Sequence, residues 1–288
     1  MAKTKVLLDT DPGSDIDDAL AISYLLKKPE CELLGVTTVT GPVDKRASIV
    51  EILCHAAGRN DVPIHCGRSD VLAYGPGQPA CPHYDSVSST PHRSTWEPDS
   101  AVDFLRRTIR AHPGEVTLLS VGPLSNVALL FAIDPEIPRL LKDFVSMAGV
   151  FDLKVDYEWN CGCDPVATAI VARTLRKRHS WIGLDVTTKC TLTKDRCEQQ
   201  FTGKLLETVL KMAENWFKGT GQITFHDPLA AVSVFVPGIV TFDHGTVTVN
   251  PAQGQTKFEH GEGHDLVATD VDPPMFFEEY FRTVTGKA

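Results

Sequence analysis

Short apolar runs alternate with amphipathic helical patterns along the first two thirds of the chain. The runs are rich in Val, Ile and Leu and end at turn residues, which is typical of buried strands. We expect these strands at residues 5–9, 33–40, 63–66, 116–121, 144–148 and 180–184. Between them, apolar residues recur at positions i, i+3 and i+4. This spacing predicts helices at residues 17–27, 45–57, 100–111, 124–133 and 165–178.

The alternation predicts an α/β fold with a mostly parallel central sheet and helices on both faces, because parallel strands are joined by crossover segments. Near the C-terminus, residues 238–250 and 267–271 predict a small antiparallel addition, and a final helix begins at Pro273. No linker divides the chain, so we expect a single domain over residues 1–288. Ligands of such sheets bind at the carboxyl ends of the strands, where we expect the functional site.

Two long segments interrupt the alternation. Residues 74–98 are rich in Pro, Gly, Ser and His, and residues 192–224 form a helical pattern that carries Trp216 and Phe217. Long connections in compact domains often serve as lids or binding loops, so both segments are candidate walls of a pocket. We expect His83 to be exposed in the first segment, and the two aromatic residues of the second to belong to the core.

The charge of the chain narrows the class of partner. The 288 residues include 28 Lys and Arg and 37 Asp and Glu, which gives a net charge of −9. This sign opposes electrostatic binding to nucleic acid or to an anionic membrane surface, so we expect a small-molecule partner. The N-terminus lacks the long apolar segment of a signal peptide, and no run of about 20 apolar residues predicts a membrane span.

The eight cysteines are too few for a disulfide scaffold, which predicts reduced thiols in a cytoplasmic protein. The pair Cys161 and Cys163 has no second Cys or His pair at the spacing of a zinc site. We therefore interpret this pair as part of a loop.

Negative charge is concentrated between the first predicted strand and the first predicted helix. Five carboxylates lie within ten residues: Asp9, Asp11, Asp15, Asp17 and Asp18. Like charges at this density raise one another's pKa unless a partner neutralises them. Oxygen ligands without Cys or His favour Ca²⁺ or Mg²⁺. Any one of these aspartates could cap the helix, but a helix start needs only one or two such groups.

The acidic run resembles the N-terminal signature of the inosine-uridine preferring nucleoside hydrolases, a family of Ca²⁺-dependent N-ribohydrolases. The family pattern is Asp-x-Asp-x-x-x-Asp-Asp, and this chain resembles a longer variant with two additional residues between the pairs. Four later segments match in order and carry the resemblance over residues 5–240: Thr37-Thr-Val-Thr-Gly41, Gly122-Pro-Leu-Ser-Asn126, Glu158-Trp-Asn160 with Asp164-Pro165, and His226-Asp-Pro-Leu-Ala230.

This resemblance implies hydrolysis of the N-glycosidic bond of ribonucleosides to ribose and free base, by a Ca²⁺-bound water that an aspartate deprotonates. Asp11 would be both a metal ligand and the base. Asp18 and Asp227 would bind the metal through carboxylates, and Ser125 through its backbone carbonyl. The resemblance also implies a role in purine and pyrimidine salvage and a homodimer or homotetramer.

For the substrate, the resemblance implies that Asp17, Glu158 and Asn160 hold ribose hydroxyls and that Met147 lines the sugar pocket. We expect His226 beside the leaving base, where an imidazole could assist its departure by general acid catalysis. The residue types agree with this chemistry, because a ring of carboxylates stabilises the cationic, oxocarbenium-like sugar of the transition state.

The chain departs from the family pattern at several positions. Pro42 stands where family members often have an Asn whose amide faces the ribose, and Ser125 replaces the usual Thr. The segment between Met147 and Glu158 is shorter than usual, and Asp15 in the extended loop has no assigned role.

Two other functions remain open from the sequence. The Asp9-Thr-Asp11 start also resembles haloacid dehalogenase-type phosphatases, although their later Ser/Thr, Lys and acidic motifs are not found. A non-catalytic nucleoside or sugar binder on the same fold is the other alternative, which Pro42 favours. Singly, Glu158 and Asn160 could be turn residues, and His226 with Asp227 could simply open a helix.

Overall fold

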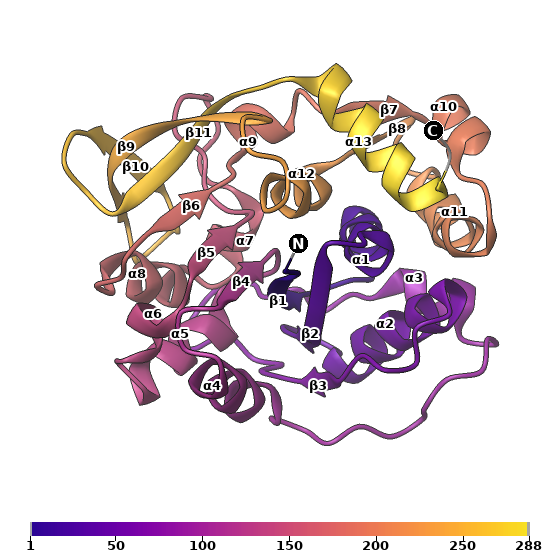
Figure 1. The fold of residues 1–288 in the computed structure, drawn as a ribbon, viewed down its shortest axis with the longest axis horizontal. Helices are drawn as coiled ribbons and strands as arrows, with labels where there is room; N and C mark the ends of the chain where they lie inside the picture. Colours follow the sequence, from indigo (N-terminus) through magenta and orange to yellow (C-terminus); the bar gives the residue numbers. More distant parts are fainter. Residues whose placement is uncertain (1, 287–288) are drawn as a thin grey trace.

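The computed structural model describes residues 2–286, and its centre is a nine-stranded sheet (Figure 1). The strand order is β10-β9-β11-β6-β5-β4-β1-β2-β3, and all neighbours are parallel except β9, which runs antiparallel to both β10 and β11. The strands are β1 (Thr4–Thr10), β2 (Cys31–Thr38), β3 (Ile64–Cys66), β4 (Val116–Ser120), β5 (Asp143–Ser146), β6 (His179–Trp181), β9 (Val240–Val249), β10 (Thr256–His260) and β11 (Asp265–Val271).

Helices cover both faces of the sheet. The side chains of β1 show why: Val6 and Leu8 pack into the core on one face, and Leu7 packs into the core on the other. The first face carries α1 (Asp17–Lys27), α2 (Val43–Ala57), α3 (Pro82–Val87), α9 (Leu184–Thr187), α10 (Lys194–Gln200), α11 (Lys204–Trp216), α12 (His226–Ser233) and α13 (Pro273–Thr285). The second carries α4 (Ala101–Ala111), α5 (Ser125–Ile133), α6 (Ile137–Leu140) and α8 (Pro165–Arg173).

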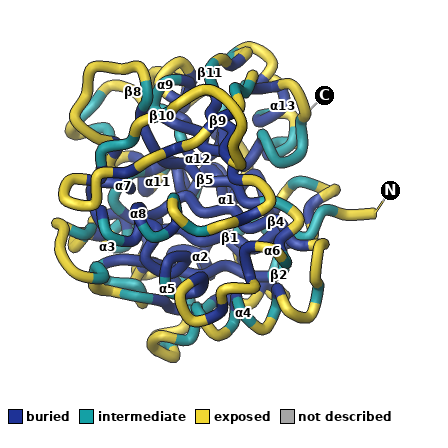
Figure 2. The backbone as a smooth tube through the Cα atoms, turned by 90° about the vertical axis from the view of Figure 1, so that its left-hand side faces the viewer, coloured by how far each residue is buried: buried dark blue, intermediate teal, exposed yellow. Residues whose placement is uncertain are grey.

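Three short elements complete the chain. Helix α7 (Trp159–Cys163) precedes α8, and β7 (Thr191–Thr193) pairs with β8 (Gln222–Thr224) in a separate antiparallel ribbon. Figure 2 shows that the central elements β1, α1 and α2 are buried and that exposed backbone lies in the outer loops. Within residues 2–286, none of the helices has the length and apolar character needed to cross a membrane.

The predicted α/β class, parallel core and antiparallel addition are confirmed. The strand β10 was not predicted, and the helix expected to reach residue 178 ends at Arg173. His83, expected at the surface, is only 2% exposed, which corrects that prediction. The reason is that His83 lies in the first turn of α3, which packs against the turn after β1: the backbone N–H of His83 donates to the carbonyl of Gly13 at 3.0 Å. Gly13 has φ +129°, and a Cβ there would lie 2.3 Å from Cys81 Sγ.

Backbone hydrogen bonds continue past the carboxyl ends of the central strands. The N–H of Val39 donates to Thr10, that of Val121 to Asp9, and that of Met147 to Ser120, at 2.8–3.1 Å. The loops that leave β1, β2, β4 and β5 are therefore held in register. Those after β1, β4 and β5 contribute Asp11, Val121 and Met147 to one cavity.

Candidate active site

The cavity at the carboxyl ends of the strands has a volume of about 320 Å³, which is within the usual range for a small-molecule site. Its lining comes from loops and helix starts that are far apart in the sequence. The lining residues are Asp11, Ser14, Asp15, Asp17, Asp18, Gln78, Val121, Met147, Val155, Tyr157, Glu158, Trp159, Asn160, Leu184, His226 and Asp227.

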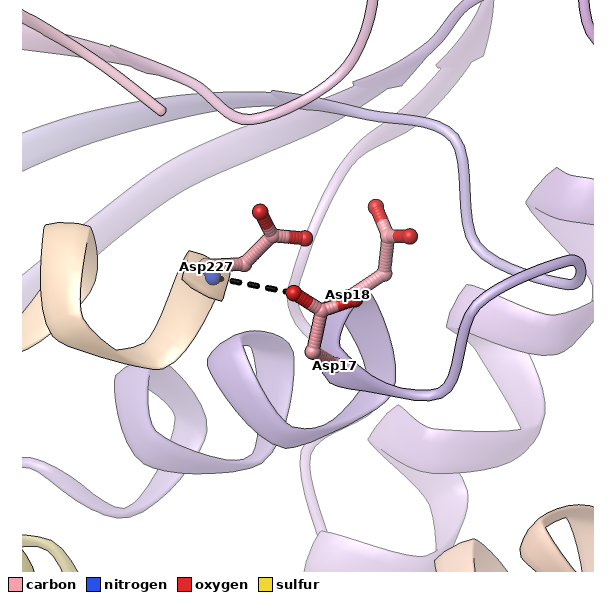
Figure 3. Close-up of side chains that lie close together, drawn as sticks. All are labelled: Asp17, Asp18 and Asp227. Carbon is pink, nitrogen blue, oxygen red and sulfur yellow. Dashed lines mark hydrogen bonds between the residues drawn. The ribbon is translucent and has the colours of Figure 1, made fainter. Parts of the chain in front are cut away.

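Two helix starts bring three carboxylates together (Figure 3). Asp17 and Asp18 form the first turn of α1, and Asp227 lies in the first turn of α12. Their oxygens lie within 4.8 Å of one another, and each residue is only 4% exposed. The backbone N–H of Asp227 donates to Asp17 Oδ2 at 3.1 Å, which fixes the two helix starts against each other.

Burial raises the pKa of every carboxyl group in this cluster. Burial is the largest cause at Asp17, Asp18 and Asp227, and each of Asp17 and Asp227 is raised further by its carboxylate neighbours. The pKa of Asp18 is raised to about 6. Among the residues described, no Lys or Arg forms an ion pair with these three side chains. The charge of Arg46 lowers the pKa of Asp18 but is in no ion-pair contact with it. Buried, clustered oxygen donors with so little counter-charge fit a hard divalent cation.

Asp11 lies beside this cluster at the end of β1. Burial and then the charge of Asp18 raise its pKa, and Arg46 lowers it through a contact of 4.0 Å to Asp11 Oδ2. The backbone N–H of Asp11 and the hydroxyl of Thr10 both donate to Asp18 Oδ1, at 3.0 and 2.5 Å. These bonds orient the Asp18 carboxylate through its Oδ1.

Asp9 belongs to a supporting layer beneath the cavity. Its Oδ1 accepts hydrogen bonds from Thr37 Oγ1 at 2.5 Å and Asn126 Nδ2 at 2.7 Å. The same Asn126 Nδ2 donates to the carbonyl of Thr38 at 3.1 Å. Residues of three of the sequence motifs thus tie together the ends of β1 and β2 and the start of α5.

The opposite wall is built around α7. Glu158 caps this helix, accepting hydrogen bonds from the N–H groups of Asn160 at 2.6 Å and Cys161 at 3.0 Å. Asn160 Nδ2 donates to the carbonyls of Val121 at 2.8 Å and Met147 at 3.1 Å. Both amide hydrogens of Asn160 are therefore engaged, and its Oδ1 remains available as an acceptor.

His226 lines the cavity at the start of α12, next to Asp227. Burial lowers the pKa of His226 to about 4, so the imidazole is neutral near pH 7. Its Nδ1 lies 2.7 Å from Thr187 Oγ1. When that hydroxyl donates to Nδ1, the proton of the ring is on Nε2.

The structure gathers all the predicted side-chain positions into this cavity except that of Ser125, which is not among the lining residues. The hydroxyl of Ser125 donates to Asp164 Oδ2 at 2.7 Å. Of the two candidate wall segments, residues 74–98 contribute Gln78 and residues 192–224 contribute none. Trp216 and Phe217 pack against the core, as predicted.

Several lining residues were not predicted as site residues: Ser14, Gln78, Val121, Val155, Tyr157, Trp159 and Leu184. A signal existed for Trp159, which lies inside the Glu158-Trp-Asn160 motif and is 51% exposed. The apolar side chains of residues 153–159 are unusually exposed for aromatic and aliphatic groups, and this exposure depends on the path of the loop.

Comparisons with known proteins point to one family. Residues 6–278 match the family model described as inosine-uridine preferring nucleoside hydrolase. Uridine nucleosidase 1 of Arabidopsis thaliana is 32% identical, covering 85% of this chain and 78% of the relative. The non-specific ribonucleoside hydrolase RihC of Salmonella newport is 31% identical, covering 88% and 85%.

Solved structures agree in fold. A plant nucleoside hydrolase superposes with a TM-score of 0.83 at 24% identity over 99% of both chains. A purine-preferring ribonucleoside hydrolase from Gardnerella vaginalis gives 0.81 at 27% identity over 98% of both. The phosphatase alternative has no support in these comparisons. The chain belongs to the inosine-uridine preferring nucleoside hydrolase family and is an enzyme that hydrolyses ribonucleosides.

Proposed function

We propose that this enzyme cleaves ribonucleosides to ribose and free base with Ca²⁺ as its cofactor. The observation that supports the proposal is the convergence of buried carboxylates from α1 and α12 on one cavity, where no Lys or Arg of residues 2–286 forms an ion pair with Asp17, Asp18 or Asp227. A folded protein pays a free-energy penalty for such a cluster unless a ligand offsets it.

In this proposal, Asp11, Asp18 and Asp227 hold the cation through carboxylate oxygens, and Ser125 contributes its backbone carbonyl. Oxygen donors without sulfur or imidazole fit Ca²⁺, which accepts six to eight such ligands. When bound, the cation offsets the negative charge of the cluster and makes water more acidic.

The side chains of the chain supply the remaining steps. Asp11 takes a proton from the attacking water, whose oxygen forms a bond to C1′ of the ribose while the bond from C1′ to the base nitrogen breaks. Asp17, Glu158 and Asn160 accept hydrogen bonds from ribose hydroxyls. The positive charge that develops on the sugar is stabilised by the surrounding carboxylates.

His226 assists the departing base as a neutral donor. In this role the Thr187 hydroxyl, 2.7 Å away, acts as the donor to Nδ1, and the Nε2–H donates to the base. The proposal is specific about the leaving group: cleavage of inosine or uridine should need His226, because the base leaves as a poor anion. A p-nitrophenyl riboside releases a stable anion and should need it little.

The test measures ribose release from a panel of purine and pyrimidine ribonucleosides, with added Ca²⁺ or with chelator, and uses p-nitrophenyl phosphate as a control substrate. We expect ribose release that depends on the cation and no phosphate release. Binding of nucleosides without any cleavage would favour a non-catalytic binder instead.

His226→Ala sharpens the test. It should strongly lower the rate on inosine or uridine and barely lower it on p-nitrophenyl riboside. Equal losses on both substrates would assign His226 to structure or sugar binding.

We also propose a cytoplasmic location and a homodimer or homotetramer. The eight cysteines are buried, free thiols, which suits a reducing compartment. Cell fractionation and native mass spectrometry test these two proposals.

A further inference from the structure

Carboxylates dominate the polar lining of the cavity, and its hydrogen-bond donors are fewer: the amides of Gln78 and Asn160 and the side chains of Ser14, Tyr157, Trp159 and His226. Six lining side chains carry a carboxyl group: Asp11, Asp15, Asp17, Asp18, Glu158 and Asp227. Ionised carboxylates only accept hydrogen bonds, whereas a sugar hydroxyl has one hydrogen to donate and two lone pairs to be satisfied. A carboxylate can take the hydrogen of the hydroxyl, but a separate donor must approach its oxygen.

Asn160 does not supply that donor. Both hydrogens of its Nδ2 are engaged by the carbonyls of Val121 and Met147. Gln78 lines the same cavity, and its side-chain amide has no hydrogen-bond partner among residues 2–286. Gln78 therefore brings an uncommitted amide, with two N–H donors and one acceptor, to a cavity rich in carboxylates.

The backbone of Gln78 is fixed on both sides of its Cα. Its N–H donates to Thr40 Oγ1 at 3.0 Å, and its carbonyl accepts from Arg46 Nη2 at 2.7 Å. Gly41 lets the two segments approach, because a Cβ there would lie 2.1 Å from the carbonyl oxygen of Gln78. The side chain thus extends from an anchored point in the wall.

Arg46 links this wall to the acidic loop. The side chain is completely buried, and it donates to five backbone carbonyls: those of Thr40, Asp11, Pro12, Gln78 and Ala80. A buried guanidinium needs such partners to offset its loss of hydration. Because Arg46 bonds to the carbonyls of both Asp11 and Gln78, it sets the position of the amide relative to the catalytic aspartate.

We propose that the side-chain amide of Gln78 donates a hydrogen bond to one hydroxyl of the ribose, and that Thr40 and Arg46 are the positioning residues that hold it there. The inference rests on the proposed function. It also accounts for Pro42, which offers no amide at the end of β2: the amide comes from the neighbouring loop instead.

The experiment compares kcat/KM for a ribonucleoside and for its 2′-deoxy, 3′-deoxy and 5′-deoxy analogues. Gln78→Leu keeps the approximate size of the side chain and removes the amide. We expect it to lower kcat/KM on the parent nucleoside by about 5- to 10-fold, the value of one hydrogen bond. The loss should disappear on the one deoxy analogue that lacks the bonded hydroxyl.

The positioning role has its own matched pair. Thr40→Val removes the acceptor for the N–H of Gln78 and should reproduce part of the loss in kcat/KM on the parent nucleoside. Thr40→Ser keeps the hydroxyl and should restore the discrimination between the parent nucleoside and the deoxy analogue. Arg46→Lys should also reduce discrimination, and the Thr40 pair gives the answer if that variant does not fold. Gln199→Leu, an exposed Gln on α10, controls for the change itself.

The outcomes separate this inference from the proposed function. If the wild-type enzyme cleaves nucleosides and Gln78→Leu matches it on every substrate, the role of Gln78 is wrong. An equal loss on all four substrates would assign the amide to the base and overturn the sugar contact. A Thr40→Val variant with normal discrimination would overturn the positioning role. Failure of the wild-type enzyme to cleave any nucleoside would instead contradict the proposed function.

Discussion

The buried carboxylates at the two ends of helix α1 lie in opposite electrostatic environments. At its start, Asp17 and Asp18 face Asp227 without an ion pair to any Lys or Arg that the structure describes, and burial raises the pKa of all three. At its end, Glu279 of α13 is also buried, at 6% exposed. It accepts hydrogen bonds from Tyr24 Oη at 2.9 Å and Lys28 Nζ at 2.7 Å, and from Arg282.

The pKa of Glu279 shows the effect of these partners. Burial alone would raise it, but the hydrogen bonds from Lys28, Arg282 and Tyr24 lower it to about 2. At the C-terminal end of α1, the buried carboxylate of Glu279 thus has hydrogen-bonding and charged partners, and it joins α1 to α13. At the start of α1, part of the negative charge of the carboxylates remains uncompensated, because the positive end of the helix dipole offsets only some of it. The difference marks the start of α1 as the place for a ligand.

The largest effect is expected from Asp227→Asn, which keeps the shape of the side chain and removes one negative charge from the carboxylate cluster at the start of α1. We expect metal affinity to fall by more than about 10²-fold, with loss of activity, because the affinity for a hard cation depends on charged ligands. The metal-free variant should remain folded, since a repulsive buried charge has gone. Calorimetric Ca²⁺ titration measures the first effect and thermal unfolding the second. Wild-type affinity in the variant would remove Asp227 from the metal site.

The next effect separates two carboxylates of the extended loop. Asp11→Asn should lower turnover by at least about 10²-fold while substrate still binds, because the proton acceptor is lost. Asp15→Asn should do far less, since the proposed mechanism gives it no proton transfer. Steady-state kinetics and substrate binding on both variants check this. The reverse result would make Asp15 the catalytic carboxylate.

The pH dependence of stability should have opposite signs at the two ends of α1. In the metal-free protein, burial raises the pKa of Asp9 and Asp15 to about 7 and that of Asp18 to about 6. A raised pKa means that the folded state binds more protons, so this stabilisation is lost as the pH rises through 6 to 7. In the presence of chelator, the Tm should be several degrees higher at pH 5 than at pH 8, because each kcal/mol of unfolding free energy shifts the Tm by roughly 2–4 °C.

Addition of Ca²⁺ should reverse this trend, because the cation competes with protons. At 100 times its Kd the cation would add about 2.7 kcal/mol of stability. Differential scanning calorimetry across this pH range checks both expectations. Equal Tm values at pH 5 and pH 8 in the presence of chelator would contradict the raised pKa values of the carboxylates near the start of α1.

The smallest effect is expected at Glu279, which lies at the C-terminal end of α1. Glu279→Gln should reduce the free energy of unfolding by about 1–3 kcal/mol near pH 7, because hydrogen bonds to a charged group are lost or weakened, and it should leave kcat unchanged. The pKa of Glu279 is lowered from 4.5 to about 2, so its stabilisation is complete above pH 4.5 and disappears as the pH falls towards 2. Urea unfolding at pH 7 and pH 3 measures this. A difference between variant and wild type that grows at pH 3 would show that the pKa has the opposite shift.

Much of the site could be predicted from local sequence. The turn between β1 and α1 places Asp11, Asp17 and Asp18 close together because they are near in the chain, and α1 was predicted with its observed bounds, Asp17–Lys27. The alternation of apolar runs and helices predicted the parallel sheet for the same reason, since each βαβ unit is a local pattern. Its edge strand β10 was missed because partly exposed residues mask its pattern.

The tertiary structure decided which distant residues share the cavity. No local pattern places Gln78 in the same cavity as Asp11, and the two loops are joined by Arg46, whose side chain donates hydrogen bonds to the backbone carbonyls of both residues. The burial of His83 and the satisfaction of Glu279 by Tyr24 and Lys28 likewise come from packing between segments remote in sequence. The sequence by itself determined the acidic chemistry and the α/β class, because residue type and short-range periodicity encode them. Only the fold determined which carboxylates find a partner, because burial and counter-charge depend on long-range contacts.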